Sequence, residues 1–211
     1  YWARTSIFPV KSEQGGIGSF IAIQEDVTQQ KQDQEKIRFL ANHDPLTGLP
    51  SLRLGMDRLE QGILNATRHK LTMALMFIDL DGFKNINDDY GHMAGDAVLK
   101  EAGQRMIFST RDTDTIARIG GDEFMVVLTN VKKPEAVSKV ASKILSRIKE
   151  PFYFQENELS IGASIGIVLC PQHGLNSSIL LQKADEAMYQ VKKSGKNDFA
   201  YYVEDENGAE N

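Results

Sequence analysis

The chain contains a single cysteine, Cys170, among its 211 residues. One cysteine cannot form an internal disulfide, which excludes a disulfide-stabilised secreted scaffold and suits a reducing cytosol. Lys and Arg form no block, and the net charge of −5 with a pI near 5.4 argues against a surface that binds nucleic-acid polymers. No apolar run approaches the length that crosses a membrane, and the first residues do not form a secretory signal. We therefore expect no membrane contact from this segment.

The composition is that of an ordinary globular protein. Hydrophobic residues make up 41% and charged residues 25% of the chain. The length fits one domain of ordinary size with a fragment attached. The chain begins at Tyr1 rather than Met. We therefore expect it to be one piece of a longer protein.

The first part of the chain differs in pattern from the remainder. Residues 1–26 contain two β-like runs, Tyr1–Val10 and Ile17–Gln24, around a Gly-containing turn. Two strands cannot bury a core alone, so we predict a fragment of another domain. Residues 27–41 lack Gly and Pro and predict a linker helix. The residues at heptad a and d spacing are Val27, Gln30, Gln34, Ile37 and Ala41. This short, half-polar seam fits a weak parallel coiled coil and a solvated single helix equally well.

Residues 42–203 alternate between helical and strand patterns. The run 71–80 is almost continuously apolar, which predicts a central strand covered on both faces. The other predicted elements are helices at 52–66, 94–108, 134–149 and 178–193, a hairpin at 115–129, and strands at 158–169 and 199–203. Helices alternating with strands, one pair of them a hairpin, predict an α+β (α/β) sandwich with a mixed central sheet flanked by helices. The acidic residues 204–211 predict a disordered tail.

Two acidic pairs stand at the ends of apolar runs. Gly120-Gly121-Asp122-Glu123-Phe124 joins two β-rich runs, and glycine takes positive φ at low cost, so we predict a tight hairpin with both carboxylates at an exposed tip. Asp79 and Asp81 end the run 71–80. Acidic residues at the ends of neighbouring strands suggest a metal site for phosphoryl transfer. An isolated Gly-Gly-Asp is more often a solvated turn, so this motif alone is a hypothesis.

Three separated motifs, in this order, identify a family resemblance. They are the segments 44–50 (DPLTGLP), 79–96 (DLDGFKNINDDYGHMAGD) and 120–124 (GGDEF). Together they resemble the GGDEF family of diguanylate cyclases over about residues 40–203. The resemblance implies a nucleotidyl-cyclase or polymerase-palm-like fold. It also implies a magnesium-dependent enzyme that condenses two GTP molecules into cyclic di-GMP and releases two pyrophosphates.

The resemblance implies a set of metal ligands. Two Mg²⁺ ions, with Mn²⁺ as a substitute, would be held in each active site by Asp79, the carbonyl of Leu80 and Asp122. Asp122 and Glu123 are the implied catalytic residues. Glu123 is either a further ligand or the acceptor of the hydroxyl proton.

The resemblance also implies the residues that bind GTP. Asn87 and Asp96 match the guanine positions, and His92 lies in the same loop. Phosphate contacts are implied for the backbone at Phe83 and for the side chains of Lys84, Lys192 and Lys196. Without the motifs, Asp96 is a first-turn carboxylate of a helix, His92 an ordinary loop residue, and the two late lysines partners of a helix dipole.

A second, regulatory site is implied by an RxxD pattern before the glycine pair. Arg111 and Asp114 would bind cyclic di-GMP as an inhibitor, and Arg118 lies near enough in sequence to assist. The alternative is a solvated loop. The chain departs from the common family pattern at Ser51-Leu52-Arg53 and at Gly82, and neither position is an implied metal ligand.

The chemistry and the first residues imply partners. One site holds one GTP, so the reaction requires a homodimer with two-fold symmetry. Residues 1–26 end in Glu25-Asp26-Val27-Thr28, which resembles the end of a PAS sensor domain. We expect a cytoplasmic bacterial protein, or the cytoplasmic part of a membrane-anchored one. The rival functions are a nucleotide-binding module without catalysis and a GTP-sensing regulator of a phosphodiesterase domain.

Overall fold

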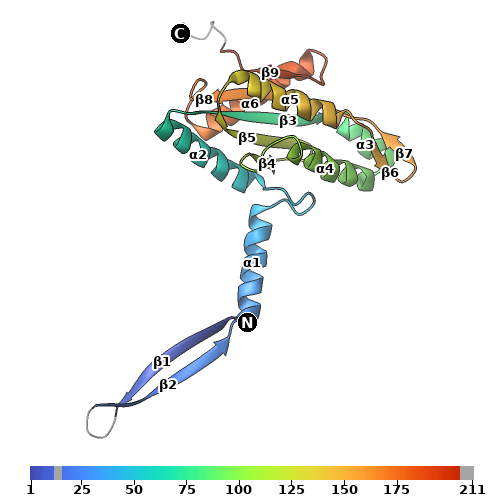
Figure 1. Cartoon of the computed structure of the whole chain (residues 1–211). Helices are drawn as coiled ribbons and strands as arrows, with labels where there is room; N and C mark the ends of the chain where they lie inside the picture. The colour runs from blue at the N-terminus through green and yellow to red at the C-terminus, as the bar shows by residue number, and fades with distance from the viewer. Residues whose placement is uncertain (12–15, 205–211) are drawn as a thin grey trace, which may run out of the picture. The chain divides into compact units, whose positions relative to one another are not determined.

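The computed structural model describes residues 1–11 and 16–204 (Figure 1). The chain divides into two compact units, residues 1–41 and residues 42–211. Residues 205–211 of the predicted tail lie outside the described residues. Glu204, which the prediction placed in that tail, forms an ion pair with Lys183, with 2.8 Å between Oε1 and Nζ.

The first unit contains a hairpin and a helix. Strands β1 (Ala3–Lys11) and β2 (Ile17–Asp26) pair antiparallel, with Ala3 opposite Asp26. Helix α1 (Thr28–Asn42) follows at once, and the Asp26 carboxylate accepts the Thr28 N–H at 2.9 Å. No residue of α1 is buried. The two strands and the helix predicted from the sequence are confirmed.

A five-stranded mixed sheet forms the centre of the second unit. The strand order is β4-β5-β3-β8-β9, and all neighbours are antiparallel except β8 and β9 (Figure 1). The bounds are β3 (Thr72–Asp81), β4 (Thr115–Arg118), β5 (Glu123–Val131), β8 (Gly162–Cys170) and β9 (Phe199–Tyr201). The mixed sheet confirms the predicted α+β architecture. Strand β3 lies at its centre, as its apolar run predicted.

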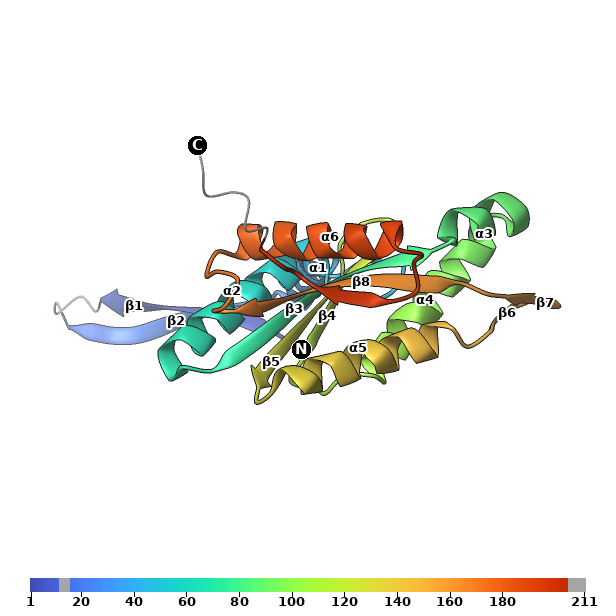
Figure 2. The same cartoon turned by 90° about the horizontal axis from the view of Figure 1, so that it is seen from above.

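Helices cover both faces of this sheet. Met73, Leu75 and Phe77 of β3 pack on α2 (Leu52–His69) and α6 (Ser177–Lys193). The alternate residues Ala74, Met76, Ile78 and Leu80 pack on α4 (His92–Ile107) and α5 (Pro134–Ile148). Figure 2 shows α6 and α5 on opposite sides of the strands. The sheet is therefore the middle layer of a sandwich with two apolar layers.

A short hairpin after α5 differs from the sequence prediction. The predicted strand 158–169 is divided, because β6 (Phe152–Phe154) and β7 (Asn157–Leu159) form a separate hairpin before β8 begins at Gly162. Helix α3 (Phe83–Tyr90) fills the segment between β3 and α4. Pro134 opens α5 at its first turn, as predicted.

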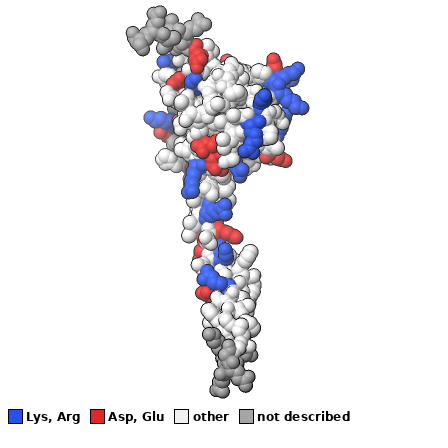
Figure 3. Space-filling model, turned by 90° about the vertical axis from the view of Figure 1, so that its left-hand side faces the viewer, with Lys and Arg blue, Asp and Glu red and all other residues white. Residues whose placement is uncertain are grey.

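The described residues contain no helix that is both long and apolar enough to cross a membrane. On the face that Figure 3 shows, basic and acidic side chains lie among one another, and large areas carry no charge. This face resembles the mixed surface expected from the composition.

Candidate active site

The pairing of β3 with β5 brings the two acidic segments together. Asp79 lies directly opposite Glu123 in the antiparallel register. The Leu80 N–H donates to the Asp122 carbonyl at 3.2 Å, which extends the pairing by one residue. At this end of the β3–β5 ladder both chain segments are acidic, so Asp79, Asp122 and Glu123 lie close together.

The Gly-Gly turn forms for a different reason from the predicted one. Strands β4 and β5 do form a hairpin, but neither Gly120 nor Gly121 adopts a positive φ. A methyl group added at Gly120 would instead overlap the Glu123 carboxylate. The N–H groups of Ile119 and Gly120 close the turn on the Glu123 carbonyl at 3.0 and 3.4 Å. Glycine at position 120 thus leaves space for the Glu123 side chain. Asp122 and Glu123 are half-buried, not exposed as the sequence predicted.

The carboxylates repel one another in this arrangement. Burial raises the pKa of Asp79, and the charges of Asp122 and Asp81 add to the increase. Burial also raises the pKa of Glu123, together with the charges of Asp79 and Asp122. Each ionised carboxylate is therefore less stable here than in water, and a positive charge placed among them would be favoured.

Lys192, near the end of α6, supplies one positive charge. Its Nζ lies 2.6 Å from Oδ2 of Asp79. Burial lowers the pKa of Lys192, but the hydrogen bond to Asp79 and the charges of Asp79 and Asp122 outweigh burial, so the pKa is raised. The ammonium stays charged and neutralises part of the acidic cluster.

The oxygen atoms of the acidic cluster are suitable ligands for a hard metal ion. Within residues 1–11 and 16–204, no group of three or more His, Cys, Asp or Glu side chains is gathered as a preformed metal cluster. The side chains of Asp79, Asp122 and Glu123 nevertheless offer carboxylate oxygens, and the pKa values of Asp79 and Glu123 are raised by burial and by the neighbouring negative charges. Hard divalent cations prefer such ligands. The residues present therefore fit Mg²⁺ or Mn²⁺ once Lys192 releases Asp79.

A cavity of about 250 Å³ lies beside these carboxylates. Its lining residues come from the end of β3, the start of α3, the acidic turn and the end of α6, namely Asp79, Leu80, Asp81, Gly82, Phe83, Lys84, Asn85, Asp122, Lys192 and Lys196. Seven of the sequence-predicted site residues are in this list. Acidic groups at the end of β3 and in the 120–124 turn thus line the same cavity as lysines from the start of α3 and the end of α6.

The start of α3 offers backbone donors to the same cavity. Gly82 has φ +84°, a left-handed conformation that favours glycine and turns the chain from β3 into the helix. The first N–H groups of a helix have no partner within the helix. Those of Phe83 and Lys84, which line the cavity, therefore have no partner within α3.

The predicted guanine residues lie on the next two helical segments. Asn87 is on α3, and a methyl group added at Gly95 would overlap its amide, which places Asn87 against the start of α4. His92 is the first residue of α4, and both His92 and Asp96 are exposed. Asp96 is in the second turn, and the first turn of α4 contains no acidic residue. The alternative role of Asp96 as a first-turn carboxylate is therefore wrong.

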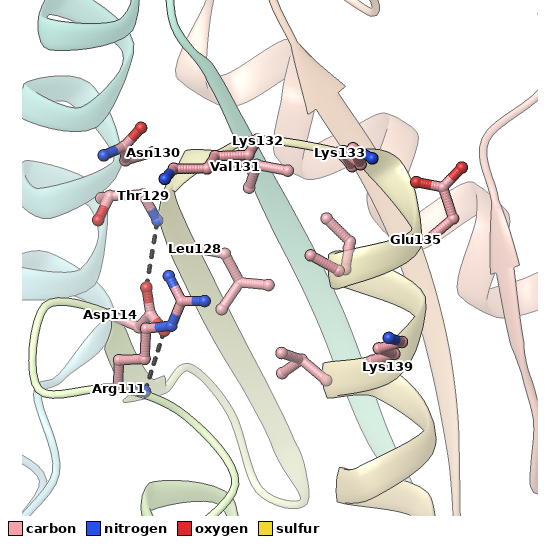
Figure 4. Close-up of a pocket in the computed structure, with 13 residues that line it drawn as sticks. Arg111, Asp114, Leu128, Thr129, Asn130, Val131, Lys132, Lys133, Glu135 and Lys139 are labelled. Carbon is pink, nitrogen blue, oxygen red and sulfur yellow. Dashed lines mark hydrogen bonds between the residues drawn. The ribbon is translucent and has the colours of Figure 1, made fainter.

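Arg111 and Asp114 lie together, at the entrance to β4. The Asp114 carboxylate accepts the N–H groups of Arg111 and Thr129 at 3.0 and 3.3 Å (Figure 4). Both residues line a second cavity, of about 410 Å³. Figure 4 shows Lys132, Lys133 and Lys139 around the same cavity. This cavity is largely apolar at its floor and basic at its rim.

Arg118 does not line the cavity of Arg111 and Asp114, and its side chain has other partners at the end of β4. Its guanidinium lies 3.0 Å from the Asp44 carboxylate and donates twice to the Gly121 carbonyl, at 2.8 and 3.1 Å. Thr47 also donates to Asp44 through its N–H and hydroxyl groups. Arg118 therefore joins the segment 44–50 to the acidic turn. Sequence reasoning missed this role, because Asp44 and Arg118 are separated by 74 positions.

Comparisons with known proteins identify the family of the chain. The family model for the diguanylate cyclase GGDEF domain matches residues 41–198. The chain belongs to the GGDEF family of diguanylate cyclases. This confirms the family that the sequence motifs suggested.

The relatives of this GGDEF domain include both enzymes that make and enzymes that degrade cyclic di-GMP. The chain is 45% identical over 163 residues to MucR of Pseudomonas aeruginosa, named as a bifunctional diguanylate cyclase and cyclic di-GMP phosphodiesterase, covering 77% of this chain and 24% of MucR. It is 36% identical over 182 residues to the cyclic di-GMP phosphodiesterase PdeR of Escherichia coli, covering 86% of this chain and 27% of PdeR. The chain therefore spans about a quarter of the length of these relatives.

A solved structure supports the fold. The isolated GGDEF domain of TpbB from Pseudomonas aeruginosa matches with a TM-score of 0.75 at 35% identity, covering 76% of this chain and 94% of that domain. The GGDEF fold is therefore shown for the second unit.

Proposed function

We propose that residues 42–203 form an active diguanylate cyclase that joins two GTP molecules into cyclic di-GMP and releases two pyrophosphates. One observation supports this best: Asp79 lies opposite Glu123, beside Asp122, at a cavity that basic residues line from the other side. A site of this composition suits a triphosphate held near divalent cations.

The metal would be held by Asp79, the Leu80 carbonyl and Asp122, with Glu123 either as a further ligand or as the acceptor of the hydroxyl proton. Two Mg²⁺ ions, or Mn²⁺ in their place, would supply positive charge to the triphosphate and lower the pKa of the attacking 3′-hydroxyl. Lys192 would then leave Asp79 for a phosphate oxygen, since both are anions within reach of its flexible side chain. The protein's own contribution is mainly the positioning of two substrates.

The remaining roles follow from the positions around the cavity. Lys84, Lys192 and Lys196 would bind phosphate oxygens together with the N–H of Phe83. Asn87 and Asp96 would hydrogen-bond guanine, whose N1 and N2 donors and O6 acceptor differ from the edge of adenine, with His92 beside them. Glu123 would either accept the hydroxyl proton or complete the metal ligands. Its raised pKa favours a role as proton acceptor.

The reaction requires a homodimer, because one site holds one GTP and the two substrates must meet head to tail. Helix α1 would set the distance between the two protomers, either as a parallel coiled coil or as a single connector. Its exposed Ile37 lies at a heptad core position, which favours the coiled coil. Residues 1–26 would be the end of a PAS-like sensor, and the protein would act in the bacterial cytoplasm.

Product inhibition is proposed for the cavity at Arg111 and Asp114. Arginine gives bidentate contacts to guanine or phosphate, and the neighbouring lysines would neutralise the phosphates of cyclic di-GMP. Arg118 is not part of this proposal, because its guanidinium is used by Asp44 and Gly121.

Incubation of the dimeric protein with GTP and Mg²⁺, followed by anion-exchange chromatography of the nucleotides, tests the proposal. We expect cyclic di-GMP from GTP, none with ATP in place of GTP, and none after chelation of the metal. A nucleotide-binding module would bind GTP and leave it unchanged. A regulator of a phosphodiesterase domain would also leave GTP unchanged, and would alter hydrolysis of cyclic di-GMP only when joined to that domain. Either result would contradict the proposal.

A further inference from the structure

Asp81 ends β3 two residues after Asp79, yet its surroundings differ from those of Asp79. The Ser164 hydroxyl lies 3.0 Å from Oδ1 and 2.9 Å from Oδ2 of Asp81. The Asn197 N–H donates to Oδ2 at 3.0 Å. Ser164 is fully buried on β8. The carboxylate thus joins β3, β8 and the loop between α6 and β9.

The loop that Asp81 holds has an unusual backbone. Lys196 and Asn197 are consecutive non-glycine residues with φ of +66° and +51°. L-amino acids rarely adopt this left-handed region, so the conformation persists only where the surroundings fix it. Three hydrogen bonds fix it here: Lys196 N–H to the Val191 carbonyl at 3.0 Å, Asn197 N–H to Asp81, and Ile165 N–H to the Asp198 carbonyl at 3.0 Å.

Gly162 holds the same loop from the other side. It is paired with Asp81 in the β3–β8 register. A methyl group added at Gly162 would lie 3.1 Å from Oδ1 and 3.2 Å from Cβ of Asn197, a tight contact that would require Asn197 to shift by a few tenths of an ångström. Asn197 is therefore seated directly on the backbone of β8. The direction of the preceding residue, Lys196, depends on that seat.

We propose that Asp81 is a positioning residue that fixes the Lys196–Asn197 turn, so that the Lys196 ammonium faces the triphosphate in the cavity. Asp81 is not a metal ligand in this account, although the sequence pairs it with Asp79. The inference depends on the proposed function, since it takes GTP as the ligand of the cavity. It predicts that Asp81 acts on substrate binding only through Lys196.

Calorimetry with a GTP analogue that has a methylene group between the α and β phosphorus atoms tests this, with GMP as the second ligand. Asp81→Ala is expected to weaken binding of the analogue roughly tenfold, the loss of about one charge-assisted contact, and to leave GMP binding unchanged. Lys196→Ala should give the same loss, and the double variant should lose no more than either single variant. Gly162→Ala, which displaces Asn197 without changing Asp81, should show the same selective loss.

Asn176→Ala is the matched control, because Asn176 caps the other end of α6 by accepting the Ile179 N–H at 3.0 Å. It should lower the melting temperature without changing the preference for the analogue over GMP. Paramagnetic resonance of Mn²⁺ distinguishes a positioning role of Asp81 from a role as metal ligand. If Asp81 only positions the turn, Asp81→Asn should bind Mn²⁺ as the wild type does. Loss of Mn²⁺ binding, additive losses in the double variant, or equal weakening of both ligands would overturn the inference. A wild-type protein that binds neither ligand would instead overturn the proposed function, and this inference with it.

Discussion

Replacement of Arg118 by alanine is expected to destabilise the GGDEF domain and to slow product formation. The Arg118 side chain is only 14% exposed, and its guanidinium binds Asp44 and the carbonyl of Gly121. Removing one partner of a fully buried ion pair costs about 3–5 kcal/mol, and a hydrogen bond to a charged group contributes about 1.5–3 kcal/mol. Gly121 is exposed to water, and Thr47 continues to donate to Asp44. We therefore expect a loss of about 2–3 kcal/mol in the free energy of unfolding.

This loss is measurable as a change in melting temperature. For a protein of this size each kcal/mol corresponds to about 2–4 °C, so Arg118→Ala should melt roughly 5–10 °C below the wild type at pH 7. Arg118→Lys should recover part of the loss, because lysine keeps the charge but cannot contact Asp44 and Gly121 together. Arg58→Ala, at an exposed position of α2, is the control and should change stability by less than about 0.5 kcal/mol.

The pH dependence identifies the partner. Burial raises the pKa of Asp44, but the hydrogen bonds from Thr47 and the charge of Arg118 outweigh burial, so the pKa is lowered in the folded protein. A carboxyl with a lowered folded-state pKa stabilises the protein fully above its unfolded pKa, and this stabilisation is lost as pH falls through the folded value. The gap between wild type and Arg118→Ala should therefore narrow in acid. Equal melting temperatures at pH 7, or a gap that is unchanged in acid, would refute the reasoning.

Three further predictions concern other parts of the domain. Asp79→Asn should raise the melting temperature of the metal-free protein at pH 7, because burial raises the folded-state pKa of Asp79, and a carboxyl with a raised folded-state pKa loses its stabilising effect as pH rises from its unfolded to its folded pKa. Scanning fluorimetry in the presence of a chelator measures the melting temperature, and a lower value for Asp79→Asn would contradict the prediction. Arg105→Ala should lower the free energy of unfolding, measured by chemical denaturation, by about 3–5 kcal/mol, because the buried Arg105 guanidinium donates to the carbonyls of Arg147, Glu150 and Pro151. A loss below about 1 kcal/mol would show that water takes over these hydrogen bonds in the variant. Arg111→Ala should abolish binding of cyclic di-GMP in calorimetry and leave the melting temperature nearly unchanged, and undiminished binding would place the inhibitor elsewhere.

Much of the fold could be predicted from local patterns. The apolar run of β3 predicted a strand covered on both faces, because a strand with one face in water would alternate apolar and polar residues. Eight of the ten residues of β3 are buried. The acidic turn and the proline that opens α5 are local signals of the same kind. The short β6–β7 hairpin was missed, because two three-residue strands are too brief for a periodic pattern.

The contacts that complete the site could not be read from the sequence. Asp81 meets Asn197 across 116 positions, and Arg118 meets Asp44 across 74. From spacing alone, Asp81 resembles a second metal ligand beside Asp79, because its partners Ser164 and Asn197 are distant in sequence. The role of Gly120 was also misjudged, because the space beside Glu123 depends on how the side chains pack and glycine is usually required by backbone conformation.

The central claim is that the carboxylates of Asp79, on β3, and Asp122, directly before β5, are both required for the formation of cyclic di-GMP. It is tested most directly by product formation from radiolabelled GTP in the wild type, Asp79→Asn and Asp122→Asn, with Asp57→Asn on the exposed side of α2 as the control. We predict cyclic di-GMP from the wild type and from Asp57→Asn, and none from either site variant although both fold. Product from Asp79→Asn or Asp122→Asn at the wild-type rate would contradict the account.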